Sequence, residues 1–119
     1  MEGFRVNVEK EYKLAMDYYT GNGVEKNYRK AVELLTKIAK KGHVEAQYWL
    51  GDYYHEHATM GEYIQSLNDN GEWWALAANN GHIDAQNRLL NDIRKNGPES
   101  AMRELEKMWW YKEAVNRIL

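Results

Sequence analysis

The sequence predicts an all-α fold, a right-handed α-solenoid of three helix-turn-helix repeats that form a single domain over residues 1–119. Three observations predict it: a short segment that recurs along the chain, apolar residues at the spacing of a helical stripe, and turns that contain glycine and asparagine between the helical stretches. A chain of 119 residues is the size of one ordinary domain, so the repeats are expected to stack on one another within it.

The recurring segment sets the length of the repeat. The sequence Gly-His-Val-Glu-Ala-Gln at residues 42–47 returns as Gly-His-Ile-Asp-Ala-Gln at residues 81–86, with only conservative exchanges. A leucine also precedes a bulky pair in each copy: Leu14 before Leu34 and Leu35, Leu50 before Trp73 and Trp74, and Leu89 before Trp109 and Trp110. The period is about 36 residues with an insertion in the middle copy, which places the repeats at about residues 10–45, 46–84 and 85–119.

Each repeat is predicted to contain two helices. In the first helix, residues at i, i+4 and i+8 form one stripe, which is expected to face the interior. The stripe consists of Ala46, Leu50 and Tyr54 in the second copy, Ala85, Leu89 and Ile93 in the third, and Lys10, Leu14 and Tyr18 in the less regular first copy. The bulky pairs belong to the second helices and are expected to pack between repeats. A two-helix unit cannot bury its apolar face alone, so stacked neighbours supply the core.

Composition excludes several classes of function. The formal net charge of −2 lacks the basic excess that binding to a phosphate backbone requires, so nucleic acid is not expected as a partner. The absence of cysteine excludes disulfides, thiolate zinc sites and a cysteine nucleophile. No apolar run reaches the length of a signal peptide or of a membrane span, so no membrane association is expected and the predicted localisation is cytoplasmic.

No catalytic, cofactor-binding or metal-binding motif is found, and we expect no enzymatic activity. The loop Gly21-Asn-Gly23 lacks the further glycine and the lysine of a phosphate-binding loop. His55 and His57 are two residues apart, a spacing that points them away from each other on a helix. His43 and His82 occupy the same place in two repeats, which indicates a structural role at the turn rather than a catalytic one.

Specific segments resemble the Sel1-like repeat, a longer relative of the tetratricopeptide repeat. They are Leu14-Ala-Met-Asp-Tyr-Tyr-Thr-Gly-Asn-Gly-Val24, Asn27-Tyr-Arg-Lys-Ala31, Ala39-Lys-Lys-Gly42 and Leu50-Gly-Asp-Tyr-Tyr54. The resemblance covers about residues 10–119, although the third copy has Leu90 in place of a packing glycine. It implies an adaptor that presents a groove, lined by its first helices, to a partner protein or peptide.

A helical wheel through the first helices indicates which side chains face that groove. It leaves Tyr48, Asp52 and His55 opposite the buried stripe, with Asn87, Asn91 and Arg94 as their counterparts in the third copy. The predicted partner-binding residues are Tyr12, Met16, Tyr19, Tyr48, Asp52, His55 and Arg94. Clustered exposed tyrosines are typical of recognition surfaces, and the alternative is that these are ordinary solvated positions.

A possible second surface combines Met60, Tyr63 and Ile64 of the inserted loop with Trp110 and Tyr111 of the last repeat. The loop could instead form an extra helical turn that folds onto its own repeat. The two aromatic residues are expected to be the more exposed part of the final repeat and to offer a weak homodimer contact. A more specific alternative to a general adaptor is a dedicated immunity or antitoxin-like inhibitor of a bacterial toxin or effector, because the chain is little more than three repeats.

Overall fold

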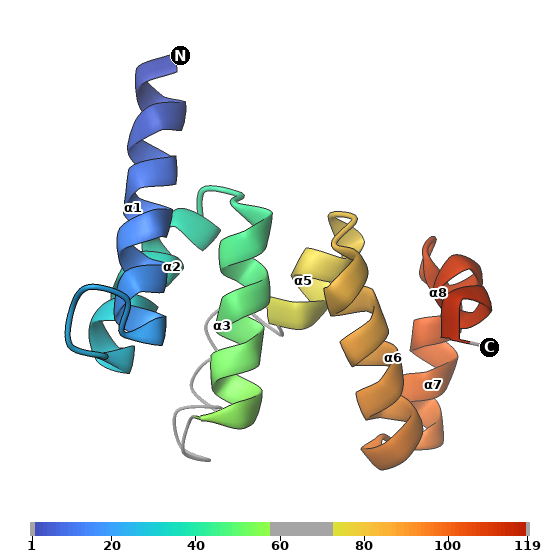
Figure 1. Cartoon of the computed structure of the whole chain (residues 1–119). Helices are drawn as coiled ribbons and strands as arrows, with labels where there is room; N and C mark the ends of the chain where they lie inside the picture. Colours follow the sequence, from blue (N-terminus) through green and yellow to red (C-terminus); the bar gives the residue numbers. More distant parts are fainter. Residues whose placement is uncertain (1, 58–72, 119) are drawn as a thin grey trace.

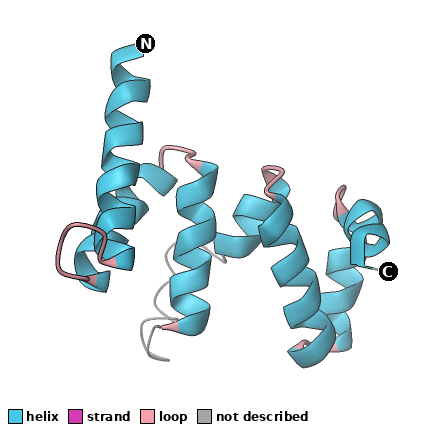
Figure 2. Cartoon of the chain, viewed as in Figure 1, coloured by secondary structure: helices cyan, strands magenta, loops and turns pink. Residues whose placement is uncertain are grey.

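The computed structural model describes residues 2–57 and 73–118, and within these ranges the chain forms seven α-helices and no β-strand (Figures 1 and 2). The helices are α1 (Glu2–Thr20), α2 (Tyr28–Ala39), α3 (Val44–Glu56), α5 (Trp73–Asn79), α6 (Ile83–Asn96), α7 (Glu99–Glu106) and α8 (Tyr111–Ile118). The predicted all-α class is confirmed.

The helices form a row that follows the order of the chain (Figure 1). The first helices of the three repeats are α1, α3 and α6, and the bulky pairs of the sequence lie in α2, at the start of α5 and directly before α8. In the last repeat, α7 precedes α8 as an additional short helix. Helix α3 packs against both α2 and α5, and α6 packs against both α5 and α8, so each of these first helices lies between two second helices.

The turns between repeats explain the recurring glycine and histidine. Gly42 and Gly81 have φ angles of +100° and +92°, a region that costs glycine little and a residue with a Cβ much more. After each glycine the chain enters the next first helix, where His43 and His82 are the N-cap residues of α3 and α6. Two short segments that look alike in the sequence therefore make the same turn.

Among the described residues, helix α3 has more buried side chains than any other helix. Ala46 and Leu50 are fully buried, and Trp73 and Trp74 are only 4% exposed, which confirms the predicted packing of this pair. Gly51 allows the close approach of α5, since a Cβ at this position would overlap the indole of Trp74. Helix α3 is therefore buried on several sides rather than along one stripe.

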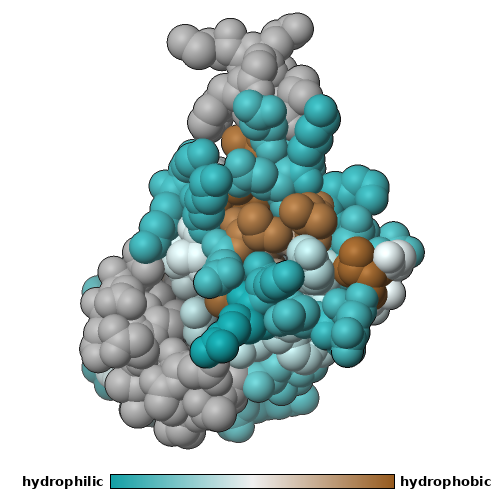
Figure 3. Space-filling model, turned by 90° about the vertical axis from the view of Figure 1, so that its left-hand side faces the viewer, coloured by the Kyte–Doolittle hydropathy of each residue, from teal (hydrophilic) through white to brown (hydrophobic). Residues whose placement is uncertain are grey.

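The stripe predicted for the first repeat is wrong by about one position. Leu14 is 42% exposed and Lys10 is exposed, whereas Val8, Ala15 and Tyr19 are buried. Contacts with α2 and with the side chains of α3 decide which side of α1 is interior. Figure 3 views the molecule from the side of α1 and α2, where a few apolar residues form a small patch framed by hydrophilic ones.

The expectation for the last aromatic pair is also wrong. Trp110 is fully buried and donates its Nε1 hydrogen to Asn79 Oδ1 at 3.0 Å, while Trp109 is 64% exposed. Trp110 belongs to a buried cluster that contains Leu105 of α7 and Ala114 of α8 together with residues of α5 and α6. Tyr111 is half-buried. The other residues of the predicted second surface, Met60, Tyr63 and Ile64, lie outside the described residues.

Candidate functional site: the face of the first helices

One carboxylate connects the first helices of all three repeats. The Tyr19 hydroxyl of α1 donates a hydrogen bond to Asp52 Oδ2 of α3 at 2.6 Å, and Arg88 Nη1 of α6 donates to Asp52 Oδ1 at 2.9 Å. We call Tyr19, Asp52 and Arg88 the groove network. It marks the face on which the three first helices come together.

The inner part of the groove network is shielded from water. Tyr19 and Asp52 are 6% and 7% exposed, while the side chain of Arg88 is 45% exposed. Burial, and then the hydrogen bond to the Asp52 carboxylate, raise the pKa of the Tyr19 hydroxyl far above its usual range. Tyr19 therefore remains a hydrogen-bond donor at neutral pH, and Asp52 holds the base of the Arg88 guanidinium while its outer part reaches solvent.

The predicted site residues divide into buried and accessible ones. Tyr19, Tyr48 and Asp52 were expected on an exposed strip and are buried instead. The helical wheel assumed that one side of α3 faces solvent, but side chains of α1, α5 and α6 surround that side. For example, Tyr48 stacks on His82 with ring centres 4.4 Å apart.

The remaining predicted residues reach the surface to different extents. Tyr12, Met16 and His55 are half-buried, and Arg94 is exposed. Tyr12, Met16 and Tyr19 share one face of α1 because they are four and three residues apart. They approach α3 at both ends of this row, where Tyr12 contacts His43 with ring centres 4.8 Å apart and Tyr19 bonds to Asp52.

Trp49 lies on the same face and was missed in the sequence analysis. It is half-buried, with its ring centre 5.4 Å from that of Tyr19 and 5.3 Å from that of Tyr48. The sequence does show a tryptophan beside Tyr48 in a predicted first helix. The helical wheel, however, placed Tyr48, Asp52 and His55 on the exposed side and left Trp49 out.

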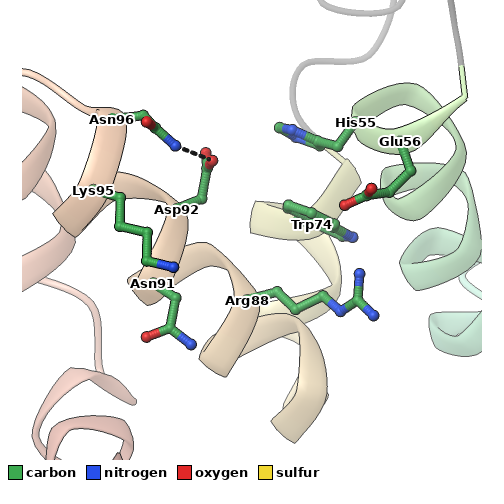
Figure 4. A pocket seen from close by; sticks show the side chains of 8 residues that line it. All are labelled: His55, Glu56, Trp74, Arg88, Asn91, Asp92, Lys95 and Asn96. Atoms are coloured by element: carbon green, nitrogen blue, oxygen red, sulfur yellow. Dashed lines mark hydrogen bonds between the residues drawn. The ribbon is translucent and has the colours of Figure 1, made fainter.

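A polar pocket of about 290 Å³ adjoins the other end of the groove network, between α3, α5 and α6 (Figure 4). We call it the α3–α6 pocket; its lining residues are His55, Glu56, Trp74, Arg88, Asn91, Asp92, Lys95 and Asn96. His55 stacks on Trp74 with ring centres 3.9 Å apart, and the Arg88 guanidinium lies 5.8 Å from the Trp74 ring. Of these residues only His55 was among the predicted site residues.

His43 and His82 connect consecutive repeats through equivalent contacts. Nδ1 of His43 accepts a hydrogen bond from the Ala46 amide, and Nδ1 of His82 accepts one from the Ala85 amide, both at 3.1 Å. Because Nδ1 is an acceptor in each ring, Nε2 carries the proton and faces a carboxylate of the first helix that precedes it in the row.

That carboxylate belongs to Glu9 at 3.2 Å from His43 Nε2 and to Glu45 at 2.8 Å from His82 Nε2. A tyrosine ring completes each contact, Tyr12 against His43 and Tyr48 against His82. We call these two sets of residues the histidine joints. The predicted structural role of the two histidines is confirmed.

Within the described residues, no group of three or more His, Cys, Asp or Glu side chains is arranged to hold a metal ion. His57 instead stacks on Tyr28 of α2 with ring centres 4.7 Å apart. None of the helices in this part of the chain combines the length and apolarity needed to cross a membrane.

Comparison with known proteins places this architecture in a family. The family described as Sel1 repeat matches residues 11–43, 44–68 and 71–82, more than half of the chain. Two curated relatives, both named Protein SHC1 and from Saccharomyces cerevisiae strains YJM789 and S288c, are 44% identical over 57 residues. The matched segment is 48% of this chain and only 11% of each relative, and no solved structure matches the chain. With three matched segments, the chain belongs to the Sel1 repeat family.

Proposed function

We propose that the protein is a non-catalytic interaction module that binds a partner protein or peptide through the face of α1, α3 and α6. Sel1 repeats generally mediate protein–protein interactions and are typically non-catalytic. The observation that carries the proposal is the groove network, because one carboxylate aligns the first helices of three repeats and leaves accessible side chains on either side of it.

The accessible side chains suit recognition. Tyr12, Met16 and Trp49 offer aromatic and flexible apolar surface at one end, and His55 and Arg88 offer polar groups at the other. Aromatic residues, methionine and arginine are enriched in protein interfaces, and partly immobilised side chains lose little conformational entropy on binding. The buried residues Tyr19, Tyr48 and Asp52 have a different role in this proposal, since they hold the contact residues in place.

The proposal keeps the broader of the two functions that the sequence suggests. No contact of the described residues favours a dedicated toxin inhibitor over a general adaptor. The cytoplasmic localisation and the weak homodimer also remain predictions, and the burial of Trp110 leaves Trp109 as the exposed aromatic residue for such a contact.

Affinity capture from a lysate of the source organism tests the proposal. The wild-type protein is compared with Trp49→Ala and Arg88→Ala, which alter the two ends of the groove, and with the controls Glu33→Ala and Lys112→Ala. Both control positions are exposed and lie on the second helices α2 and α8. We expect a stoichiometric partner that the groove variants lose and the controls retain. Equal capture by all variants, with circular dichroism showing that each is folded, would contradict binding through the groove.

A further inference from the structure

Several hydrogen-bond donors of α6 that line the α3–α6 pocket have no partner among the described residues. Arg88 uses Nη1 on Asp52 and makes no second hydrogen bond to the described residues. Lys95 and Asn91 make no hydrogen bond or ion pair there either, although both line the pocket. All three side chains come from α6, at spacings of three and four residues that place them on one side of the helix (Figure 4).

The two acidic residues of the pocket differ in their contacts. Asp92 Oδ1 already accepts a hydrogen bond from Asn96 at 3.3 Å, a contact drawn in Figure 4. Glu56 lies across the pocket on α3 and makes no ion pair with the described residues. The Glu56 carboxylate and the second oxygen of Asp92 are therefore the acidic acceptors that compete with a ligand for the cations of α6.

Asp52 also holds the Arg88 guanidinium in a position from which it can bind a ligand. It fixes the guanidinium at one end of the pocket, and Arg88 lies within 5.8 Å of two ring centres, those of Tyr48 and Trp74. A guanidinium held in this way loses less freedom on binding, and its planar fork of donors matches the two oxygens of a carboxylate. The ammonium of Lys95, two turns further along α6, adds a second positive charge.

We propose that the α3–α6 pocket receives a side-chain carboxylate of an acidic segment of the partner, bound by Arg88 and Lys95, with Glu56 opposing it in the free protein. This inference rests on the proposed function, because it assigns a chemistry to one end of the same groove. It predicts that the partner segment carries an aspartate or glutamate at the end that meets α6.

Selection from a phage-displayed library of short random-sequence peptides tests the inference without knowledge of the natural partner. The full chain is the bait, and the dissociation constants of selected peptides are then measured by fluorescence anisotropy. We expect peptides enriched in Asp and Glu, and an about ten-fold weaker affinity when the critical acid is replaced by its amide. The same peptides should bind Arg88→Gln and Lys95→Gln more weakly and Glu56→Gln more tightly.

Peptide affinity for the Glu56→Gln variant shows whether the pocket prefers a negatively or a positively charged side chain of the ligand. Weaker binding to this variant, or selection of peptides rich in Lys and Arg, would overturn the inference. Peptides with no acidic preference that nevertheless lose affinity for Trp49→Ala would overturn it and leave groove binding intact. Peptides that bind all these variants equally, or a failure to select any peptide, would contradict both the inference and the proposed function.

Discussion

The Tyr19 hydroxyl and the Asp52 carboxylate, 33 residues apart in sequence, form a buried hydrogen bond of 2.6 Å that joins the first repeat to the second. Because the other oxygen of Asp52 binds Arg88, the same carboxylate also joins the second repeat to the third. One acidic side chain therefore contacts the first helices of all three repeats.

Loss of the Tyr19 hydroxyl should destabilise the protein. Tyr19→Phe leaves Asp52 Oδ2 buried without its donor, and we expect the free energy of unfolding to fall by about 1–3 kcal/mol. The measurement is urea denaturation followed by circular dichroism. Tyr18→Phe is the matched control, since Tyr18 neighbours Tyr19 and is only half-buried, and it should have little effect. A double-mutant cycle with Asp52→Asn should show that the two substitutions are not additive.

Stability should decline in alkaline solution. Burial, the largest cause, raises the pKa of Tyr12, Tyr19 and Tyr48 above their ordinary value. The folded protein therefore holds these phenolic protons to higher pH than the unfolded chain, whose tyrosines titrate at about pH 10. The stabilisation is complete below that pH and is lost as the pH rises through and above it.

We expect the free energy of unfolding to fall above about pH 10, and to fall less steeply in Tyr19→Phe than in the wild type. Denaturation curves collected at a series of alkaline pH values give this slope. An identical slope in the two proteins would show that Tyr19 does not titrate differently in the folded state.

Two substitutions of His82 should separate the contribution of its N-cap hydrogen bond to stability from that of its contacts with α3. His82→Ala removes the N-cap acceptor of α6 and the contacts with Glu45 and Tyr48, and should cost about 1–2 kcal/mol. His82→Asn restores a good N-cap residue and should recover part of that loss. Thermal unfolding of the two variants measures the difference. Equal stability of His82→Ala and His82→Asn would mean that capping contributes nothing at this turn.

Gly51 should tolerate no side chain while Trp74 is present. A Cβ at Gly51 would come within 2.6 Å of Trp74 Cγ, so Gly51→Ala should cost about 1–3 kcal/mol by overpacking. Trp74→Leu removes the ring, and adding Gly51→Ala to this variant should cost much less. The comparison uses chemical denaturation of the wild type, both single variants and the double variant. An equal cost of Gly51→Ala in both backgrounds would place the strain elsewhere than at Trp74.

The repeat and its turns could be predicted because their causes are local. The glycine and histidine of residues 42–47 and 81–86 serve the turn and the N-cap. The glutamine serves the packing of consecutive repeats, since Gln47 Nε2 donates to the Ala39 carbonyl oxygen and Gln86 Nε2 to that of Ala78. A recurring structure therefore required a recurring sequence.

The exposure of the groove residues could not be predicted in the same way. A helical wheel orders the residues of one helix but does not show how many neighbours that helix has. Asp52 and Tyr48 lie opposite the apolar stripe of α3 and are nevertheless buried, because Tyr19 and Arg88 reach Asp52 from both neighbouring first helices. The α3–α6 pocket was missed for a related reason, since α3, α5 and α6 each contribute only part of its lining.

The same argument explains the last aromatic pair. Trp109 and Trp110 are adjacent in the turn between α7 and α8, where no helical wheel applies, and Trp110 is buried while Trp109 is exposed. Their order in the sequence does not reveal that Trp110 packs in one buried cluster with residues of α5, α6, α7 and α8.

Site-specific photocrosslinking tests the central claim most directly. A photoreactive phenylalanine analogue replaces Met16 on the groove face of α1 or, as the control, the exposed Glu33 of α2, and the cells are irradiated. We predict a discrete covalent adduct with a partner protein from the Met16 position and none from the Glu33 position. Adducts from Glu33 alone, or the same adducts from both positions, would contradict binding through the face of the first helices.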